Sequence, residues 1–187
     1  MKIVLASSNE HKVKEINAIV VGLNLEFILP PQGFDPIEDG KTFEENSLIK
    51  AKEAWKLGKT WTLADDSGLC IDALGGAPGI HSARYADTPQ ARIDRVLTEM
   101  HGVENRSARF KCCMTLLNPE GEVAFSYTGV CEGSIVDHQR GVNGFGYDPI
   151  FMVDEETSVA MLSDEEKNKI SHRADAIRKL ADILNSK

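Results

Sequence analysis

The stretch ADDSGLCIDALGGAPGIHSARYA, Ala64–Ala86, joins a predicted strand to a charged segment and a glycine-rich loop. The apolar run Trp61–Ala64 leads into it and is typical of a buried strand. We expect this strand to end at Asp65, because Asp65 and Asp66 would repel each other in a core unless a cation or a proton compensated them. Gly75–Gly79 follows closely, and carboxylates beside such glycines are typical of metal-assisted phosphate chemistry.

The composition indicates an ordinary globular protein. The 187 residues fit one domain, or two small lobes that share a core. The net charge of −8 argues against broad binding to nucleic acid or to an anionic membrane, which needs a basic surface. No apolar run approaches the roughly 20 residues of a membrane span, and the N-terminus turns polar too early for a signal peptide.

The cysteines predict the compartment. They show no CxxC spacing, and two of them are adjacent, so they would face opposite sides of a strand. We expect all of them to be reduced, buried thiols of a cytoplasmic protein. They are Cys70, Cys112, Cys113 and Cys131.

The first part of the chain alternates strand and helix patterns. Lys2–Ser7 predicts a buried strand, a helix begins after Asn9, and Leu25–Leu29 predicts a second strand. The capping-box spacing of Thr42 with the glutamate three residues later starts another helix, which ends near Gly58.

The later part adds a hairpin and two more helical segments. A helix begins at Thr88 and ends at Gly102, and Arg106–Leu117 alternates as a long strand that pairs with Glu122–Val130 through a turn. Ser163 starts a second capping box. The last helix has apolar residues at helical spacing: Ile177, Leu180, Ala181 and Leu184. The whole pattern predicts an α/β fold with a mixed sheet.

Two carboxylates are candidates for catalysis. Asp66 could hold Mg²⁺ and activate a water molecule, with Asp65 and Ser67 orienting it, although an Asp-Ser turn explains the same residues without a reaction. Glu38 lies on a loop and is free to turn into a cleft. The helix dipole alone explains the acidic residues of the helical turn that follows.

A polar segment between the first strand and the first helix is a candidate phosphate site. It consists of Ser7, Ser8, Asn9, Glu10, His11 and Lys12. Backbone N–H groups at a helix N-terminus favour phosphate, and Lys12 adds a positive charge. The GxxxxGK[ST] pattern of a Walker loop is absent, and an ordinary polar loop is the alternative interpretation.

Two further motifs could recognise a base. Phe145 lies between glycines, so its ring could support a flat base, or it could simply pin a tight turn. Ser171 can cap the last helix, which leaves His172 and Arg173 in its first turn. The helix dipole disfavours cations there, which indicates that they reach for a ligand, although a solvated turn is the alternative.

The ordered set of motifs resembles one family. The segments ASSNEHK, TFEENSLIKA, ADDSGL, GGAPGIHSARYA, GFGYDPIF and EEKNKISHR occur in this order over almost the whole chain. They resemble the non-canonical purine nucleoside triphosphate pyrophosphatases, also called inosine triphosphate pyrophosphatases. The resemblance implies an elongated mixed α/β sheet flanked by helices, with two lobes around a deep substrate cleft. It also implies a single domain over residues 1–187 and a homodimer.

The resemblance also implies a reaction. The enzymes of this family hydrolyse ITP, dITP and XTP to the monophosphate and pyrophosphate with Mg²⁺, for which Mn²⁺ is a possible substitute, and so cleanse the nucleotide pool. By this resemblance Glu38 and Asp66 hold the metal, and Asp66 is the general base. The substrate-binding residues are then Ser7, Ser8, Asn9, Glu10, His11, Lys12, Lys50, Ser67, Phe145, Gly146, Tyr147, Asp148, Lys167, His172 and Arg173.

Each part of this set has an expected role. Ser7–Lys12 and Lys50 would bind the phosphates, and Phe145 would stack on the base. A donor aimed at O6 by Lys167 or by the first turn of the last helix would accept hypoxanthine and xanthine but meet the amino group of adenine. Two other functions stay open: a nucleotide sensor that does not hydrolyse its ligand, and a phosphatase that releases orthophosphate.

Overall fold

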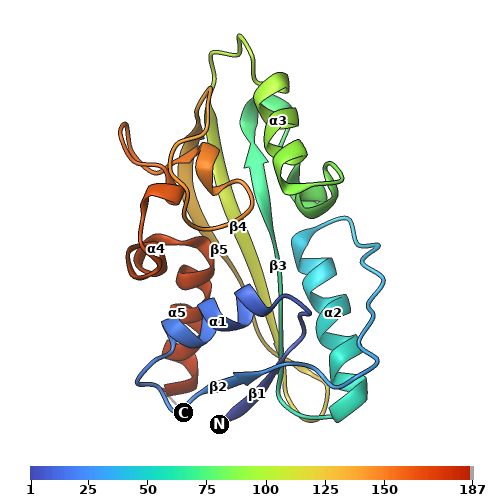
Figure 1. Cartoon of the computed structure of the whole chain (residues 1–187). Helices are drawn as coiled ribbons and strands as arrows, with labels where there is room; N and C mark the ends of the chain where they lie inside the picture. The colour runs from blue at the N-terminus through green and yellow to red at the C-terminus, as the bar shows by residue number, and fades with distance from the viewer. Residues whose placement is uncertain (186–187) are drawn as a thin grey trace. The chain divides into compact units, whose positions relative to one another are not determined.

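The computed structural model describes residues 1–185 (Figure 1). Its strands form one six-stranded sheet in the order β2-β1-β3-β4-β5-β6, and α-helices flank the sheet, as predicted. Contacts divide the chain into two compact units. The first unit comprises Met1–Asp66, Cys112–Gly129 and the chain from His172 onward, and the second comprises Ser67–Lys111 and Val130–Ser171. Three strands, β3, β4 and β5, each pass from one unit to the other.

Parallel strands begin the first unit. They are β1 (Lys2–Leu5), β2 (Glu26–Ile28) and the first residues of β3, a strand that spans Thr62–Ile71. β1 lies between the other two and is parallel to both, with Val4 opposite Thr62. Both early strands confirm the predictions made from their apolar runs.

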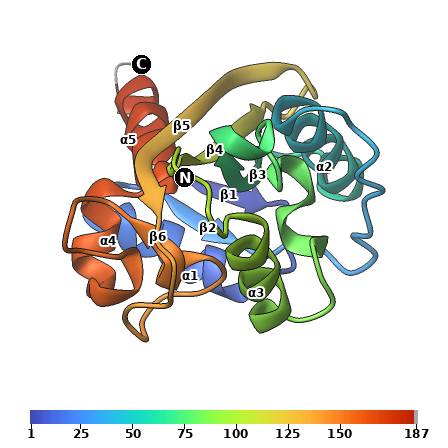
Figure 2. The same ribbon diagram turned by 90° about the horizontal axis from the view of Figure 1, so that it is seen from above.

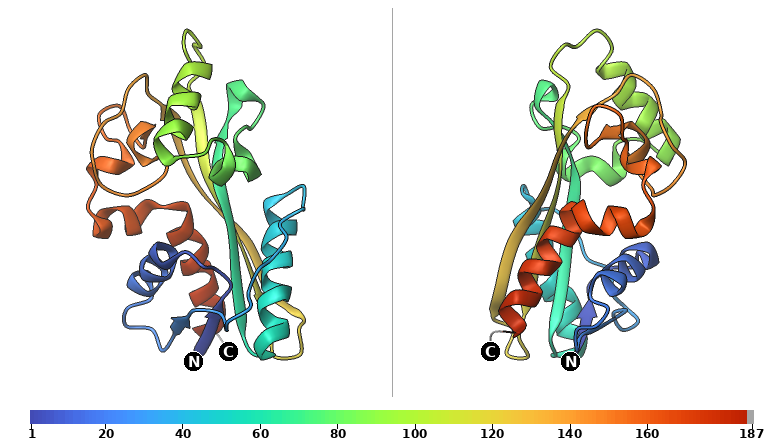
Figure 3. Two further views of the ribbon diagram at one scale, coloured as in Figure 1. Left: turned by 45° about the vertical axis from the view of Figure 1, so that its right-hand side comes forward. Right: turned by 90° about the vertical axis from the view of Figure 1, so that its left-hand side faces the viewer.

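The helices of the first unit lie on opposite faces of these strands. Helices α1 (Glu10–Ile19) and α5 (His172–Asn185) pack against each other on one face, and α2 (Phe43–Gly58) covers the other (Figure 3). Successive residues along a strand point to opposite faces. Accordingly, Ile3 and Leu5 join the cluster of α1 and α5, whereas neighbouring Val4 and Ala6 join that of α2.

The predicted helix starts are confirmed, with one change of detail. Asn9 caps α1, and Thr42 caps α2 by accepting a hydrogen bond from the Glu45 backbone N–H. The Glu45 carboxylate does not close a capping box. It accepts instead from the Lys41 N–H at 2.6 Å, one residue earlier, and so holds the incoming loop rather than the cap.

The prediction that a strand ends at Asp65 is wrong. β3 continues through Asp65 and Asp66 as far as Ile71, and both carboxylates are buried. Local sequence predicts an interruption because adjacent buried charges cost free energy. The strand continues because lysine and arginine side chains from other elements compensate both charges.

Parts of two hairpin strands, together with several short elements, build the second unit (Figure 2). The hairpin strands are β4 (Ser107–Leu117) and β5 (Val123–Ile135), and the latter runs five residues beyond the predicted Glu122–Val130. β5 then pairs antiparallel with β6 (Phe151–Met152), which the sequence did not indicate. The helices of this unit are α3 (Pro89–Glu99) and α4 (Asp164–Ile170).

The second unit has its own core. Leu69 from β3, Val96 from α3, Phe110 from β4 and Phe151 from β6 meet in one apolar cluster. In the adjoining loop, Gly75–Gly79, all three glycines have positive φ, and their positions face open space. Backbone conformation therefore explains these glycines without a ligand.

The four cysteines are buried and free, as predicted. Burial raises the pKa of each thiol, to about 11 for Cys131. Over residues 1–185, every helix is too short or too polar to cross a membrane.

Candidate functional site

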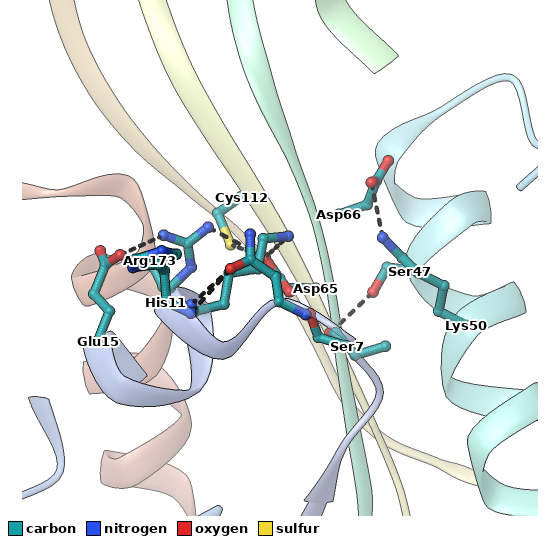
Figure 4. Close-up of polar contacts among 12 residues, drawn as sticks. Ser7, His11, Glu15, Ser47, Lys50, Asp65, Asp66, Cys112 and Arg173 are labelled. Carbon is teal, nitrogen blue, oxygen red and sulfur yellow. Dashed lines mark hydrogen bonds and ion pairs between the residues drawn. The ribbon is translucent and has the colours of Figure 1, made fainter. Parts of the chain in front are cut away.

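Two adjacent carboxylates on β3 organise the polar groups of the first unit. Asp65 and Asp66 point to opposite faces of the strand, as the alternation of a strand requires (Figure 4). Asp65 lies on the face of α1 and α5, and Asp66 on that of α2. Each carboxylate therefore meets a different set of cations.

On the first face the charges form a buried chain. The Lys12 ammonium lies 2.9 Å from Asp65 Oδ2, and Arg173 Nη2 lies 3.4 Å from the same oxygen. Arg173 Nη1 also donates to Glu15 Oε2 at 3.0 Å. The Arg173 side chain is 1% exposed, so its charge depends on these two carboxylates.

Neighbouring charges keep Asp65 and Arg173 ionised. Burial alone would raise the pKa of Asp65, but Lys12 and Arg173 hold it well below its ordinary value. Burial alone would lower the pKa of Arg173, but Glu15 and Asp65 raise it. Two positive and two negative charges thus balance within one cluster.

On the second face Lys50 joins two carboxylates. Its ammonium donates to Asp66 Oδ1 at 3.0 Å and lies 3.2 Å from Glu38 Oε2. The other oxygen of Asp66, Oδ2, is buried without a hydrogen-bond partner among residues 1–185. A buried carboxylate oxygen left in this state points to a ligand that the protein alone does not supply.

The pKa values on this face follow from burial and neighbouring charge. Burial raises the pKa of Asp66, and the Lys50 ammonium offsets part of that rise. For Lys50, burial lowers the pKa, but the carboxylates of Asp65, Asp66 and Glu38 outweigh it, so that its pKa is raised. Lys50 is therefore a firmly charged ammonium between two acids.

The donor set suits Mg²⁺ rather than a metal with a complete protein cage. Mg²⁺ is generally held by one or two carboxylates together with water and substrate phosphates. Glu38 and Asp66 both contact the Lys50 ammonium, and one oxygen of Asp66 has no partner among the described residues. Residues 1–185 contain no group of three or more acidic, histidine or cysteine side chains that could hold a metal by itself.

The loop that carries Glu38 is fastened to α2 by a residue that sequence reasoning missed. Asn46 is fully buried, and its Oδ1 accepts from the Gly40 N–H at 2.9 Å. A Cβ at residue 40 would lie only 2.6 Å from that oxygen, so the close approach requires glycine. A buried asparagine within a helix was the available signal, because buried amides need partners.

The predicted phosphate segment leads into α1 and forms its first turn. Ser7 Oγ accepts from the Asn9 N–H, and Asn9 Oδ1 accepts from the N–H groups of His11 and Lys12. An incoming phosphate would compete with Asn9 for those two amides. The Lys12 ammonium contacts Asp65, and the Lys12 side chain is 16% exposed.

The second unit contains a second polar cluster. The Lys167 ammonium donates to Asp148 Oδ2 at 2.9 Å and lies 4.2 Å from the centre of the Phe145 ring. The same Asp148 oxygen accepts from the Phe145 N–H at 3.0 Å. Lys167 thus contacts the ring and Asp148 fixes the backbone of Phe145, while 40% of the residue remains exposed. Tyr147 is buried and donates to the Ser82 carbonyl, and burial raises its pKa to about 12.

The predicted site residues therefore fall into two groups. Ser67 follows Asp66 on β3 and belongs with the second unit, and Gly146 adopts a positive φ beside Phe145. His172 and Arg173 begin α5, as predicted, but both are buried, and Arg173 contacts Glu15, which sequence reasoning missed. Glu15 stands one helical turn after Lys12, and its spacing gave no distinct signal.

Comparison with known proteins shows which family the sequence resembles. The sequence pattern described as the Ham1 family matches residues 3–183. The dITP/XTP pyrophosphatase of Treponema denticola is 46% identical, covering 95% of each chain, and that of Bacillus subtilis is 44% identical, covering 98% of this chain and 96% of the relative.

Solved structures agree with the sequence comparison. A HAM1 protein from Coxiella burnetii superposes with a TM-score of 0.90 at 41% identity, covering all of both chains. The Staphylococcus aureus Ham1 protein gives a TM-score of 0.89 at 38% identity, covering 100% of this chain and 99% of that one. With the match spanning nearly its full length, the chain belongs to the Ham1 family.

Proposed function

We propose that this protein hydrolyses the non-canonical purine nucleotides ITP, dITP and XTP to the nucleoside monophosphate and pyrophosphate. The observation that carries the proposal is the convergence of Glu38 and Asp66 on Lys50, with one Asp66 oxygen unpaired. This arrangement suits phosphoryl chemistry, which depends mainly on positioning and charge neutralisation. The relatives named dITP/XTP pyrophosphatase support the choice of substrate.

The residues of the first unit divide the work. Lys12 pairs with phosphate oxygens and neutralises their charge. Asp66 Oδ2, which lacks a partner among the described residues, accepts the proton of the water that attacks the α-phosphorus. Lys50 keeps Asp66 and Glu38 oriented and can share its ammonium with the departing pyrophosphate.

Glu38 and Asp66 would hold Mg²⁺, or Mn²⁺ in its place. The bound ion would supply positive charge to the phosphate oxygens and help orient them. Ser7, Ser8, Asn9, Glu10 and His11 would provide polar groups beside the phosphates.

Residues of the second unit would receive the base. Phe145 is partly exposed, Asp148 holds its backbone N–H and Lys167 contacts its ring, so the ring is suited to stack on a purine. Lys167 is also a donor for the 6-oxo group, and Gly146 and Tyr147 shape its surroundings. His172 and Arg173 would also contact the substrate, for which Arg173 must exchange its contact with Glu15.

The proposal extends to the partners, the compartment and the oligomeric state of the protein. A small nucleotide is the substrate, and the net charge of −8 disfavours nucleic acid and anionic membranes as partners. The buried free thiols suit the reducing cytoplasm, where nucleotide pools are cleansed. The resemblance to the family further supports a homodimer.

The test is product analysis. The purified protein is incubated with ITP, XTP, GTP and ATP, with Mg²⁺ or with a chelator. We expect pyrophosphate from ITP and XTP only, and only when the metal is present. Release of orthophosphate would favour a phosphatase that removes the terminal phosphate. Tight binding of ITP without turnover would favour a nucleotide sensor.

A further inference from the structure

We infer that Asp65 is a positioning residue, which holds the Lys12 ammonium in place for the triphosphate. The inference rests on the proposed function, because it specifies how the phosphate group of that same site is prepared. It concerns the carboxylate next to Asp66, the proposed general base. Asp65 itself touches neither the phosphates nor the nucleobase. The Asp65 side chain is fully buried, so it acts on a ligand only through the cations that it contacts.

The geometry combines a buried anchor with a partly exposed lysine side chain. Asp65 Oδ2 receives the Lys12 ammonium at 2.9 Å from within the sheet, whereas the lysine side chain remains partly exposed. A lysine ammonium has three N–H donors. One donor satisfies Asp65, which leaves others for the oxygens of a polyphosphate.

Arg173 makes Asp65 a rigid support. Its Nη2 lies 3.4 Å from the same Asp65 oxygen, and Glu15 holds Nη1 at 3.0 Å. Lys12 and Glu15 come from α1 and Arg173 comes from α5, so two helices fix the carboxylate that β3 supplies. A flexible lysine anchored in this way loses less conformational freedom when a ligand binds.

A purely electrostatic role of Asp65 and a positioning role predict opposite changes in the affinity for a polyanion. Removing a negative charge beside a phosphate site would strengthen the binding of a polyanion, because repulsion is lost. If Asp65 instead positions Lys12, its removal weakens binding, because the ammonium is no longer held. The sign of the change therefore distinguishes the two roles.

The experiment measures the affinity of inorganic tripolyphosphate by calorimetry in a double-mutant cycle. The proteins are the wild type, Asp65→Asn, Lys12→Ala and the double variant. We expect Asp65→Asn to weaken binding about tenfold, as loss of one charge-assisted hydrogen bond would. In the Lys12→Ala background the same change has little effect, because the residue through which Asp65 acts is missing.

Glu15→Gln is the matched control. It removes one negative charge from the same buried cluster, but the amide oxygen can still accept from Arg173 Nη1. The support of Asp65 therefore remains, and we expect affinity to stay the same or increase. Unchanged or tighter binding by Asp65→Asn would overturn the inference, and so would an equal loss in both backgrounds. If Asp65→Asn does not fold, Asp65→Glu replaces it in the cycle. It keeps the charge but moves the carboxylate, so the weakening should again depend on Lys12.

The binding measurement is separate from turnover. A wild type that binds tripolyphosphate but does not hydrolyse ITP would refute the proposed function while the cycle still decides the role of Asp65. A wild type that hydrolyses ITP but shows no dependence of binding on Asp65 would refute only this inference.

Discussion

Asp65 and Asp66 are neighbours on one strand, yet they bind cations that come from different helices. Asp65 contacts Lys12 of α1, and Asp66 contacts Lys50 of α2. The alternation of side chains along β3 produces this division. A single strand thus supplies a structural carboxylate to one face and a chemically available carboxylate to the other.

The first prediction concerns Asp66. Asp66→Asn should lower kcat for ITP by about 10²–10⁴-fold, as loss of a general base does. The amide is nearly isosteric and can still accept from Lys50, so the fold should remain. Steady-state kinetics together with circular dichroism check this result. A folded variant with near-normal kcat would contradict the role of Asp66 as base and metal ligand.

The second prediction concerns the loop that carries Glu38. In Gly40→Ala the new methyl group would lie 2.6 Å from Asn46 Oδ1 and would force the loop away from α2. We expect a higher Mg²⁺ concentration for half-maximal turnover, because Glu38 moves away from Asp66. A magnesium titration measures it, and Asn46→Ala should show the same shift. An unchanged magnesium requirement in both variants would show that this fastening does not position Glu38.

The third prediction concerns the Phe145 ring. Phe145→Ala should raise KM for ITP roughly five- to 150-fold, since stacking of a base on an aromatic ring contributes about 1–3 kcal/mol. Val142→Ala is the control, because Val142 is almost fully exposed on the same segment and should behave as the wild type. Equal KM values for all three proteins would place the base elsewhere.

The fourth prediction concerns the contact between β5 and α5. A Cβ at residue 129 would lie 2.1 Å from the His172 carbonyl oxygen, which is backbone and cannot turn aside. Gly129→Ala should therefore destabilise the protein by about 1–3 kcal/mol or more, the usual cost of overpacking. Urea unfolding measures the free energy of unfolding.

Gly58→Ala is the matched control for that substitution. Its new methyl group would meet only a Thr60 methyl at 3.7 Å, and it lies at the end of α2. Alanine stabilises helices relative to glycine by up to about 1 kcal/mol, so this variant should be at least as stable as the wild type. A loss of stability equal to that of Gly129→Ala would count against the packing argument.

The fifth prediction concerns the cysteines and pH. Burial raises all four thiol pKa values, so in mildly alkaline buffer the reactive thiolate is scarce and inaccessible. Iodoacetamide should label the folded protein slowly, and the rate should increase as pH rises toward the thiol pKa. Mass spectrometry should find four modifications only after unfolding in guanidinium. Rapid labelling of the native protein would contradict the buried positions.

Local signals were sufficient for most of the fold. Side-chain oxygens of Asn9, Thr42 and Ser163 do cap helices, because capping depends on residues only a few positions apart. The apolar alternation of β4 was equally local. Its later residues are buried on both sides, however, and alternation cannot show a second covered face.

The site required information that lies far apart in the sequence. Continuation of β3 through Asp65 depends on Lys12 and Arg173, which are 53 and 108 residues away in sequence. No local pattern shows that these charges will meet. The partnership of Glu38 with Lys50 and the support from Asn46 likewise arise from folding of a loop onto α2.

Isotope labelling shows which phosphorus atom receives the oxygen of the attacking water. ITP is hydrolysed in water labelled with a heavy oxygen isotope, and the products are separated and weighed by mass spectrometry. Attack at the α-phosphorus predicts one heavy oxygen in the nucleoside monophosphate and unlabelled pyrophosphate. Label in pyrophosphate or in orthophosphate would mean that water attacks another phosphorus atom, and would contradict the proposed reaction.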